Sequence, residues 1–114
     1  MNPRRIVESF GSPHWTQQSD SRMCAFDVKV NGEQEAFHLI LDFPKTILVT
    51  FAHHLGGPPA EKDLEAIARV WIGELVSNGK LDHWPVSFPK QLPPIDYTNI
   101  QSLIHNARQR GWLG

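Results

Sequence analysis

The Asn31-Gly32 pair, which stands between two runs of strand-forming residues, constrains the fold more than any other feature of this sequence. Both central residues of a type I′ turn need a positive φ angle, which Asn and Gly adopt with little strain. A two-residue turn at this point pairs Phe26 with Phe37. That register places the apolar residues of both runs on one face of a β-hairpin, namely Cys24, Phe26, Val28, Phe37, Leu39 and Leu41. The opposite face then carries Asp27, Lys29 and His38.

A third strand is predicted at Thr46–Phe51, where β-branched residues are frequent. The second strand of the hairpin contains Leu39, Ile40 and Leu41 in succession, so it is apolar on both faces. Such a strand is typical of the centre of a sheet. We therefore expect a three-stranded antiparallel sheet.

Helices are predicted before and after these strands in the sequence. A short one is expected at Pro3–Phe10, and a long one at about Ala60–Ser77, where apolar residues recur at spacings of three and four. A C-terminal helix is expected at about Tyr97–Arg110. The four prolines of Lys80–Pro94 exclude regular helix there and favour an extended strap on the core. The predicted fold is α+β, with residues 1–114 forming one domain.

The composition excludes several classes of protein. The net charge of −1 provides no overall field to attract nucleic acid or an anionic membrane. The sequence has no signal-peptide pattern and no apolar run of membrane-spanning length, so a soluble, cytoplasmic protein is expected. The one cysteine, Cys24, forms no intramolecular disulfide and lies on the inward hairpin face. We interpret it as a small buried hydrophobe rather than a reactive thiol.

No motif indicates catalysis or a cofactor. The six histidines include no pair at the helical i,i+4 spacing of metal ligands, and no serine stands in a nucleophile-elbow motif. The minority alternative is a small metal-dependent enzyme in which His38, His53 and Asp42 converge. A zinc site needs three or four convergent donors. The prediction is therefore a protein that is not an enzyme, with no catalytic residue, metal or cofactor.

Binding to another protein is the function that the sequence favours. The outward face of the predicted sheet carries more apolar residues than a solvated face needs, and such faces are typical of interfaces. The expected partner-binding residues are His38, Ile40, Leu48 and Thr50, with the Trp84 strap as second choice. A small inhibitor, immunity protein or adaptor, of the type carried by phages or mobile elements, fits this description by analogy. A second copy of the chain is the alternative partner.

DNA binding through the C-terminal helix is the second alternative. Residues 107–113, ARQRGWL, resemble the end of a recognition helix in winged-helix domains. That resemblance would imply a DNA-binding transcriptional regulator using Arg4, Arg5, Arg108 and Arg110 if the two ends of the chain meet. A winged helix also needs a short turn before this helix and a β-wing after it. The Pro-rich segment before the helix does not fit that pattern.

Overall fold

The computed structural model describes residues 5–81 and 89–113. Its elements in chain order are β1 (Val7–Phe10), β2 (His14–Gln17), β3 (Ser21–Val30), β4 (Phe37–Pro44), α1 (Lys45–Leu55), α2 (Glu61–Ser77), β5 (Lys90–Gln91) and α3 (Ile100–Gln109). The predicted α+β class is confirmed, but over the described residues the sheet has five strands rather than three.

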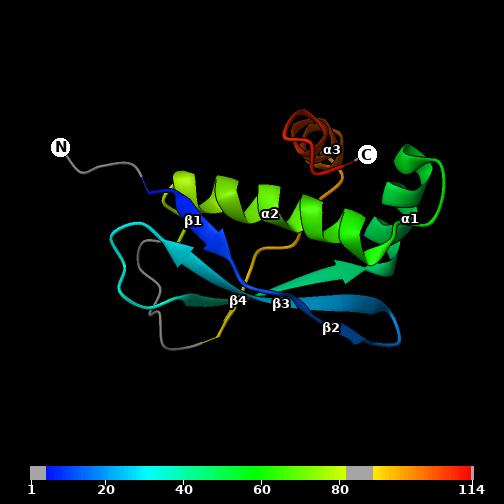
Figure 1. Cartoon of the computed structure of the whole chain (residues 1–114). Helices are drawn as coiled ribbons and strands as arrows, with labels where there is room; N and C mark the ends of the chain where they lie inside the picture. Colours follow the sequence, from blue (N-terminus) through cyan, green and yellow to red (C-terminus); the bar gives the residue numbers. More distant parts are fainter. Residues whose placement is uncertain (1–4, 82–88, 114) are drawn as a thin grey trace.

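The sheet is built on the antiparallel pair β3 and β4, as the hairpin prediction required (Figure 1). The short strands β1 and β2 both pair with β3, one after the other along it, and β5 pairs parallel with β4. Gly11 lies in the break between β1 and β2, and its N–H donates to the Asp27 carbonyl (2.7 Å). A Cβ at Gly11 would lie only 3.2 Å from that oxygen, so a larger residue would push the edge away from β3.

The hairpin has the predicted faces but a different register. Phe26 pairs with Leu39 rather than with Phe37, so six residues, Asn31 to Ala36, connect the strands. A shift of two residues preserves the strand alternation, and all six predicted core residues of the hairpin are buried. The type I′ turn is wrong, because Asn31 does not have a positive φ angle. The side chain of Asn31 instead bonds to the residue before β1, its Oδ1 accepting from the Ile6 N–H (2.7 Å).

Gly32 does have the positive φ angle that the sequence predicted, at 84°. Gly32→Val should therefore lower the free energy of unfolding by about 1–3 kcal/mol, the cost of a strained backbone position. Gly57→Val is the matched control, because the space beside both glycines is open but Gly57 lies outside the left-handed region. Urea unfolding measures both. Equal midpoints for the two variants would contradict a conformational requirement at Gly32.

The predicted third strand is a helix. Residues 46–51 lie within α1, and the buried residues Ile47 and Phe51 are spaced by four, as on one face of a helix. Pro44 precedes the helix in an extended conformation, and Gly56 ends it with a φ angle of 81°. These two end signals and the helical spacing outweigh the β-branched composition on which the strand prediction rested.

The predicted N-terminal helix is also wrong over its described part. Val7–Phe10 is strand β1, paired with Val28–Val30 of β3. Ile6, just before the strand, is 53% exposed. Backbone hydrogen bonds to the edge of β3 satisfy this segment in place of helical ones.

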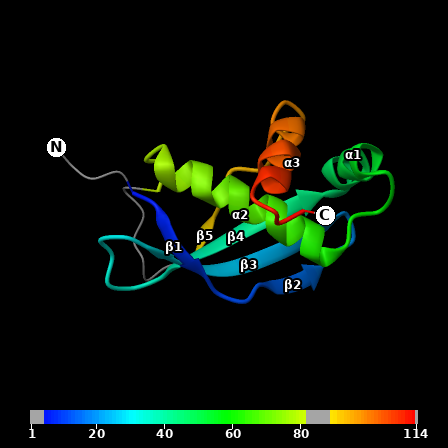
Figure 2. The same cartoon turned by 45° about the horizontal axis from the view of Figure 1, so that its top comes forward.

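The predicted helices at Ala60–Ser77 and Tyr97–Arg110 are confirmed as α2 and α3, with ends that agree to within three residues. The helices α1, α2 and α3 of the described residues lie on one side of the sheet, with α2 across the sheet and α3 on α2, farther from it (Figures 1 and 2). The C-terminal helix therefore does not cover the outward sheet face. The core forms between the sheet and α2 and continues under α3, where Ile100, Leu103, Ile104 and Ala107 are buried.

Part of the Pro-rich strap is extended, because Lys90–Gln91 form strand β5. β5 runs beside β4, and the Leu92 N–H donates to the Ile40 carbonyl (2.8 Å). Leu92 and Ile95 are buried, and the Trp71 Nε1–H donates to the Pro93 carbonyl (3.0 Å). These contacts fix the segment that leads into α3.

Candidate protein-binding groove

The predicted partner-binding residues do not form one face. His38 and Ile40 lie on β4 and point away from the helices, whereas Leu48 and Thr50 lie on α1. The Thr50 hydroxyl donates to the Thr46 carbonyl within that helix (3.0 Å). Trp84 lies outside the described residues. The expectation that these residues share one sheet face is therefore wrong, because Leu48 and Thr50 belong to a helix and not to a third strand.

The His38 imidazole forms a close polar contact with Asp27 of the neighbouring strand. Its Nδ1 lies 2.6 Å from Oδ1 of Asp27, its cross-strand partner. Asp42 follows on the same face of β4, and His53 lies on α1. Within residues 5–81 and 89–113, no group of three or more His, Cys, Asp or Glu residues is placed to hold a metal ion. The geometry gives the metal alternative no support.

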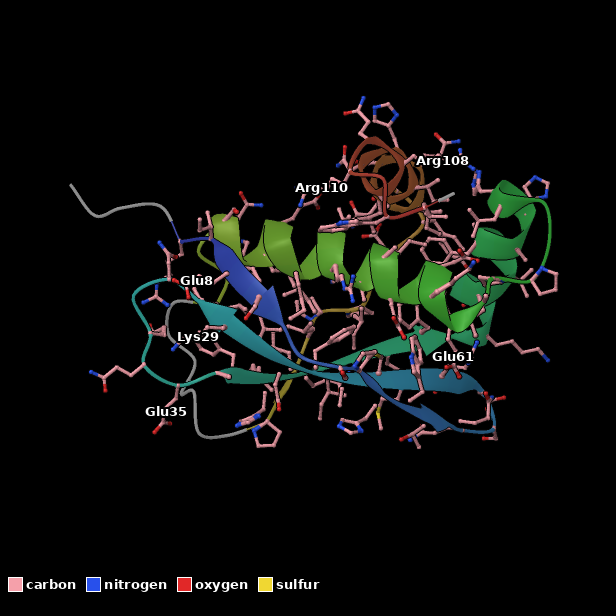
Figure 3. The ribbon with its side chains drawn as sticks, viewed as in Figure 1. Glu8, Lys29, Glu35, Glu61, Arg108 and Arg110 are labelled. Atoms are coloured by element: carbon pink, nitrogen blue, oxygen red, sulfur yellow. The ribbon has the colours of Figure 1, made fainter. Side chains whose placement is uncertain are left out.

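The arginines of the DNA-binding alternative do not gather. Arg5 forms an ion pair with Glu33 of the β3–β4 connection (2.9 Å), and Arg4 lies outside the described residues. Arg108 and Arg110 lie at the end of α3, on the far side of α2 from the sheet (Figure 3). The Arg110 guanidinium stands over the Trp112 ring, 5.1 Å from its centroid. The described arginines of this alternative, Arg5, Arg108 and Arg110, therefore do not form one continuous basic surface.

Cys24 is fully buried in β3, as predicted. Burial raises the pKa of its thiol from 9.0 to about 12, and the negative charges of Glu65 and Glu61 add to the effect. A thiol with so high a pKa carries almost no thiolate at neutral pH, and thiolate is the nucleophilic form. Cys24 is therefore not a catalytic candidate.

A groove beside α1 is the strongest candidate binding site. Four residues of α1 line it, Lys45, Leu48, Val49 and Ala52, at the i, i+3, i+4, i+7 spacing of one helix face. Pro58 and Pro59, from the connection to α2, form another part of its wall, and Arg22 of β3 also lines it. The groove has a volume of about 330 Å³. Leu48 packs against the core, whereas Val49 is 61% exposed.

The local structure explains why this groove is apolar. Ile47 and Phe51 bury the core-facing side of α1, which turns Leu48 and Val49 toward the α1–α2 connection. Two successive prolines have no backbone N–H, so this wall lacks two donors that water would otherwise bind. The groove therefore presents apolar surface that is only partly covered by the chain's own residues.

The charge at the groove is positive on balance. Lys45 is exposed and is the first residue of α1, whose first turn contains no acidic residue. The positive end of the helix dipole and the lysine charge therefore add rather than cancel. Arg22 stacks over the Trp15 ring and forms an ion pair with Glu61 (3.0 Å). Its charge is partly neutralised, which leaves Lys45 as the stronger attraction for an anion.

Sequence reasoning identified Leu48 but missed its groove neighbours. Their helical spacing was readable in the sequence, and it was overlooked because residues 46–51 were interpreted as a strand. In a strand, Leu48 and Val49 point to opposite faces, so their joint position in the groove follows only from the helix.

No helix in the described ranges has the length and apolar character needed to cross a membrane. Comparisons with protein-family models, with curated proteins and with solved structures found no match to this chain. A function for this chain therefore has to be inferred from its own geometry.

Proposed function

We propose that this chain is a protein-binding protein whose α1 groove docks an apolar segment of another protein flanked by acidic residues. The observation that carries the proposal is the exposure of Val49, which is 61% accessible in a groove whose other apolar residues are Leu48, Ala52 and two prolines. Exposed apolar surface in a concave setting is typical of interaction sites. The proposal includes a cytoplasmic inhibitor, immunity protein or adaptor, the type that the sequence favoured.

The charge around the groove supports an acidic partner rather than a basic one. A carboxylate beside Lys45 would neutralise both the ammonium group and the positive end of the α1 dipole. A lysine or arginine at the same place would meet like charge. Charge complementarity of this kind governs partner choice and association rate more than affinity.

Peptide selection tests the groove directly. Two random peptide libraries, each with one large apolar residue, would carry either Asp and Glu or Lys and Arg beside it. We expect enrichment from the acidic library only. Val49→Asp should weaken binding of a selected peptide by about thirtyfold, which corresponds to the roughly 2 kcal/mol lost at an interface hot spot. Fluorescence anisotropy with a labelled peptide measures this change.

Thr50→Asp is the matched control, because Thr50 is the next residue of α1 but does not line the groove. It should leave the affinity within about twofold of wild type, the range of an uncoupled surface change. Lys45→Glu should reverse the preference toward the basic library. An equal loss for Val49→Asp and Thr50→Asp, or no enrichment from either library, would contradict the proposal.

A second copy of the chain is the competing occupant. Light scattering over a range of protein concentrations distinguishes it from a separate partner. A dimer that Val49→Asp dissociates would assign the groove to self-association and would overturn the acidic-segment proposal. A monomer at all concentrations agrees with the proposal, because it leaves the groove open for another protein.

A further inference from the structure

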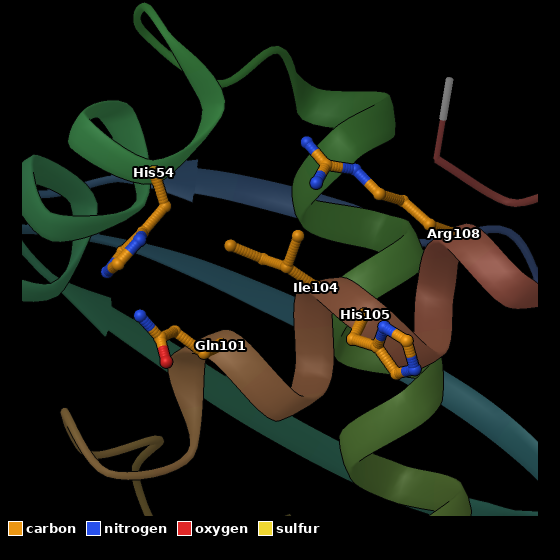
Figure 4. A pocket seen from close by; sticks show the side chains of 5 residues that line it. All are labelled: His54, Gln101, Ile104, His105 and Arg108. Atoms are coloured by element: carbon orange, nitrogen blue, oxygen red, sulfur yellow. The ribbon is translucent and has the colours of Figure 1, made fainter.

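A second pocket, separate from the α1 groove, lies between α1 and α3. The structure places His54, Gln101, Ile104, His105 and Arg108 around it, with a volume of about 230 Å³. Figure 4 shows His54 approaching Gln101 from α1, with Ile104 between these two residues and Arg108. The α3 residues follow the i, i+3, i+4, i+7 pattern of one helix face, so the pocket is a consequence of how α3 is rotated against α1.

The lining of this pocket is rich in nitrogen and contains no acidic residue. Four of its five side chains carry nitrogen atoms, and Arg108 carries a permanent positive charge. The α2 carboxylate that reaches α3 is that of Glu74, which accepts a hydrogen bond from Asn106 (3.2 Å), a residue outside the lining. No salt bridge or hydrogen bond of the Arg108 side chain is found among the described residues. The guanidinium therefore has donors to offer a ligand.

Two of the lining residues, His54 and Ile104, are held in place by neighbouring groups. The His54 ring packs edge-on against the His53 ring, with centroids 5.7 Å apart. Ile104 is buried and forms an apolar floor beneath the polar side chains. Pockets for drug-sized ligands span about 300–1,000 Å³. The volume of this pocket lies below that range, so its ligand should be smaller than a typical drug molecule.

We infer that this pocket binds a compact phosphate monoester, with the phosphate against Arg108 and the nitrogen donors around it and the organic group on Ile104. Guanidinium groups bind phosphate through paired, charge-assisted hydrogen bonds. The apolar floor gives an ester an advantage over inorganic phosphate. This inference does not depend on the α1 groove, since the two sites share no residue.

Titration of the folded protein with phenyl phosphate, followed by ¹H–¹⁵N NMR, tests the inference. Shifts should be confined to the five lining residues and their helix neighbours, and phenyl phosphate should bind more tightly than inorganic phosphate or benzoate. Arg108→Gln should weaken binding by about tenfold, the usual scale of one charge-assisted hydrogen bond. Gln101→Glu should weaken it as well, because a carboxylate on the pocket wall repels the phosphate.

Arg110→Gln is the matched control, since Arg110 lies two residues from Arg108 but stacks on Trp112 outside the pocket. It should change the affinity by less than about twofold. Equal losses for the two arginine variants would show diffuse surface charge only and would overturn the inference. Equal affinities for phenyl phosphate and inorganic phosphate would do the same. A single-stranded oligonucleotide that outcompetes phenyl phosphate would overturn it in favour of nucleic acid.

Discussion

Phe43→Ala is expected to lower the free energy of unfolding by about 3–5 kcal/mol, the range for large-to-small changes at buried aromatic residues. Phe43 is fully buried in β4. Its ring centroid lies 5.9 Å from that of Trp15 in β2 and 6.3 Å from that of Phe51 in α1. Removal of the ring therefore leaves a cavity where three elements meet, and aromatic contacts are lost with it. Urea unfolding of the purified variant measures the loss.

Tyr97→Ala is the control for this prediction, because it truncates another aromatic residue that is 59% exposed. A change within about 0.5 kcal/mol is expected there. Hydrogen exchange adds a local measurement, since Phe43 holds α1 against the sheet through Phe51. The α1 amides should lose protection in Phe43→Ala. A loss of stability no larger than that of Tyr97→Ala would contradict the packing described for this residue.

Ionisation of Cys24 should lower the free energy of unfolding by about 4 kcal/mol in total as the pH rises from 9 to 12. Its thiol pKa is about 12 in the folded state and 9.0 ordinarily. Below pH 9 the thiol is protonated in both states and has no effect. Between pH 9 and 12 the unfolded chain releases this proton and the folded chain retains it, so stability falls as pH rises. The slope approaches about 1.4 kcal/mol per pH unit.

Cys24→Ala isolates this effect from lysine titration, which both proteins share. The variant should begin less stable because it loses the buried sulfur atom. Its stability should then fall more slowly than that of the wild type above pH 9. Denaturant midpoints at a series of pH values from 8 to 11 provide the comparison. Parallel pH profiles for the two proteins would show that the folded thiol ionises like an exposed one.

Local sequence patterns were sufficient to predict those elements in which buried residues recur at a regular spacing. α2 and α3 repeat apolar residues at helical spacing, and β3 alternates them along one face, so the sequence alone predicted which residues enter the core. The faces of the hairpin were correct despite the wrong register, because a shift of two residues leaves the strand period unchanged. The groove could not be predicted in the same way, since only one of its residues was identified.

The sequence by itself determined the α+β class, the helices α2 and α3 and the inward face of the β3–β4 pair, because short-range periodicity encodes which side of an element is buried. Only the tertiary structure decided the conformation of Val7–Phe10 and of Lys45–Leu55. Val7–Phe10 forms backbone hydrogen bonds with the edge of β3. Lys45–Leu55 forms a helix that buries Ile47 and Phe51 in the core. Both choices depend on neighbours distant in sequence, which a local pattern does not contain. The exposure of Val49 and the meeting of His54 with α3 are products of those choices.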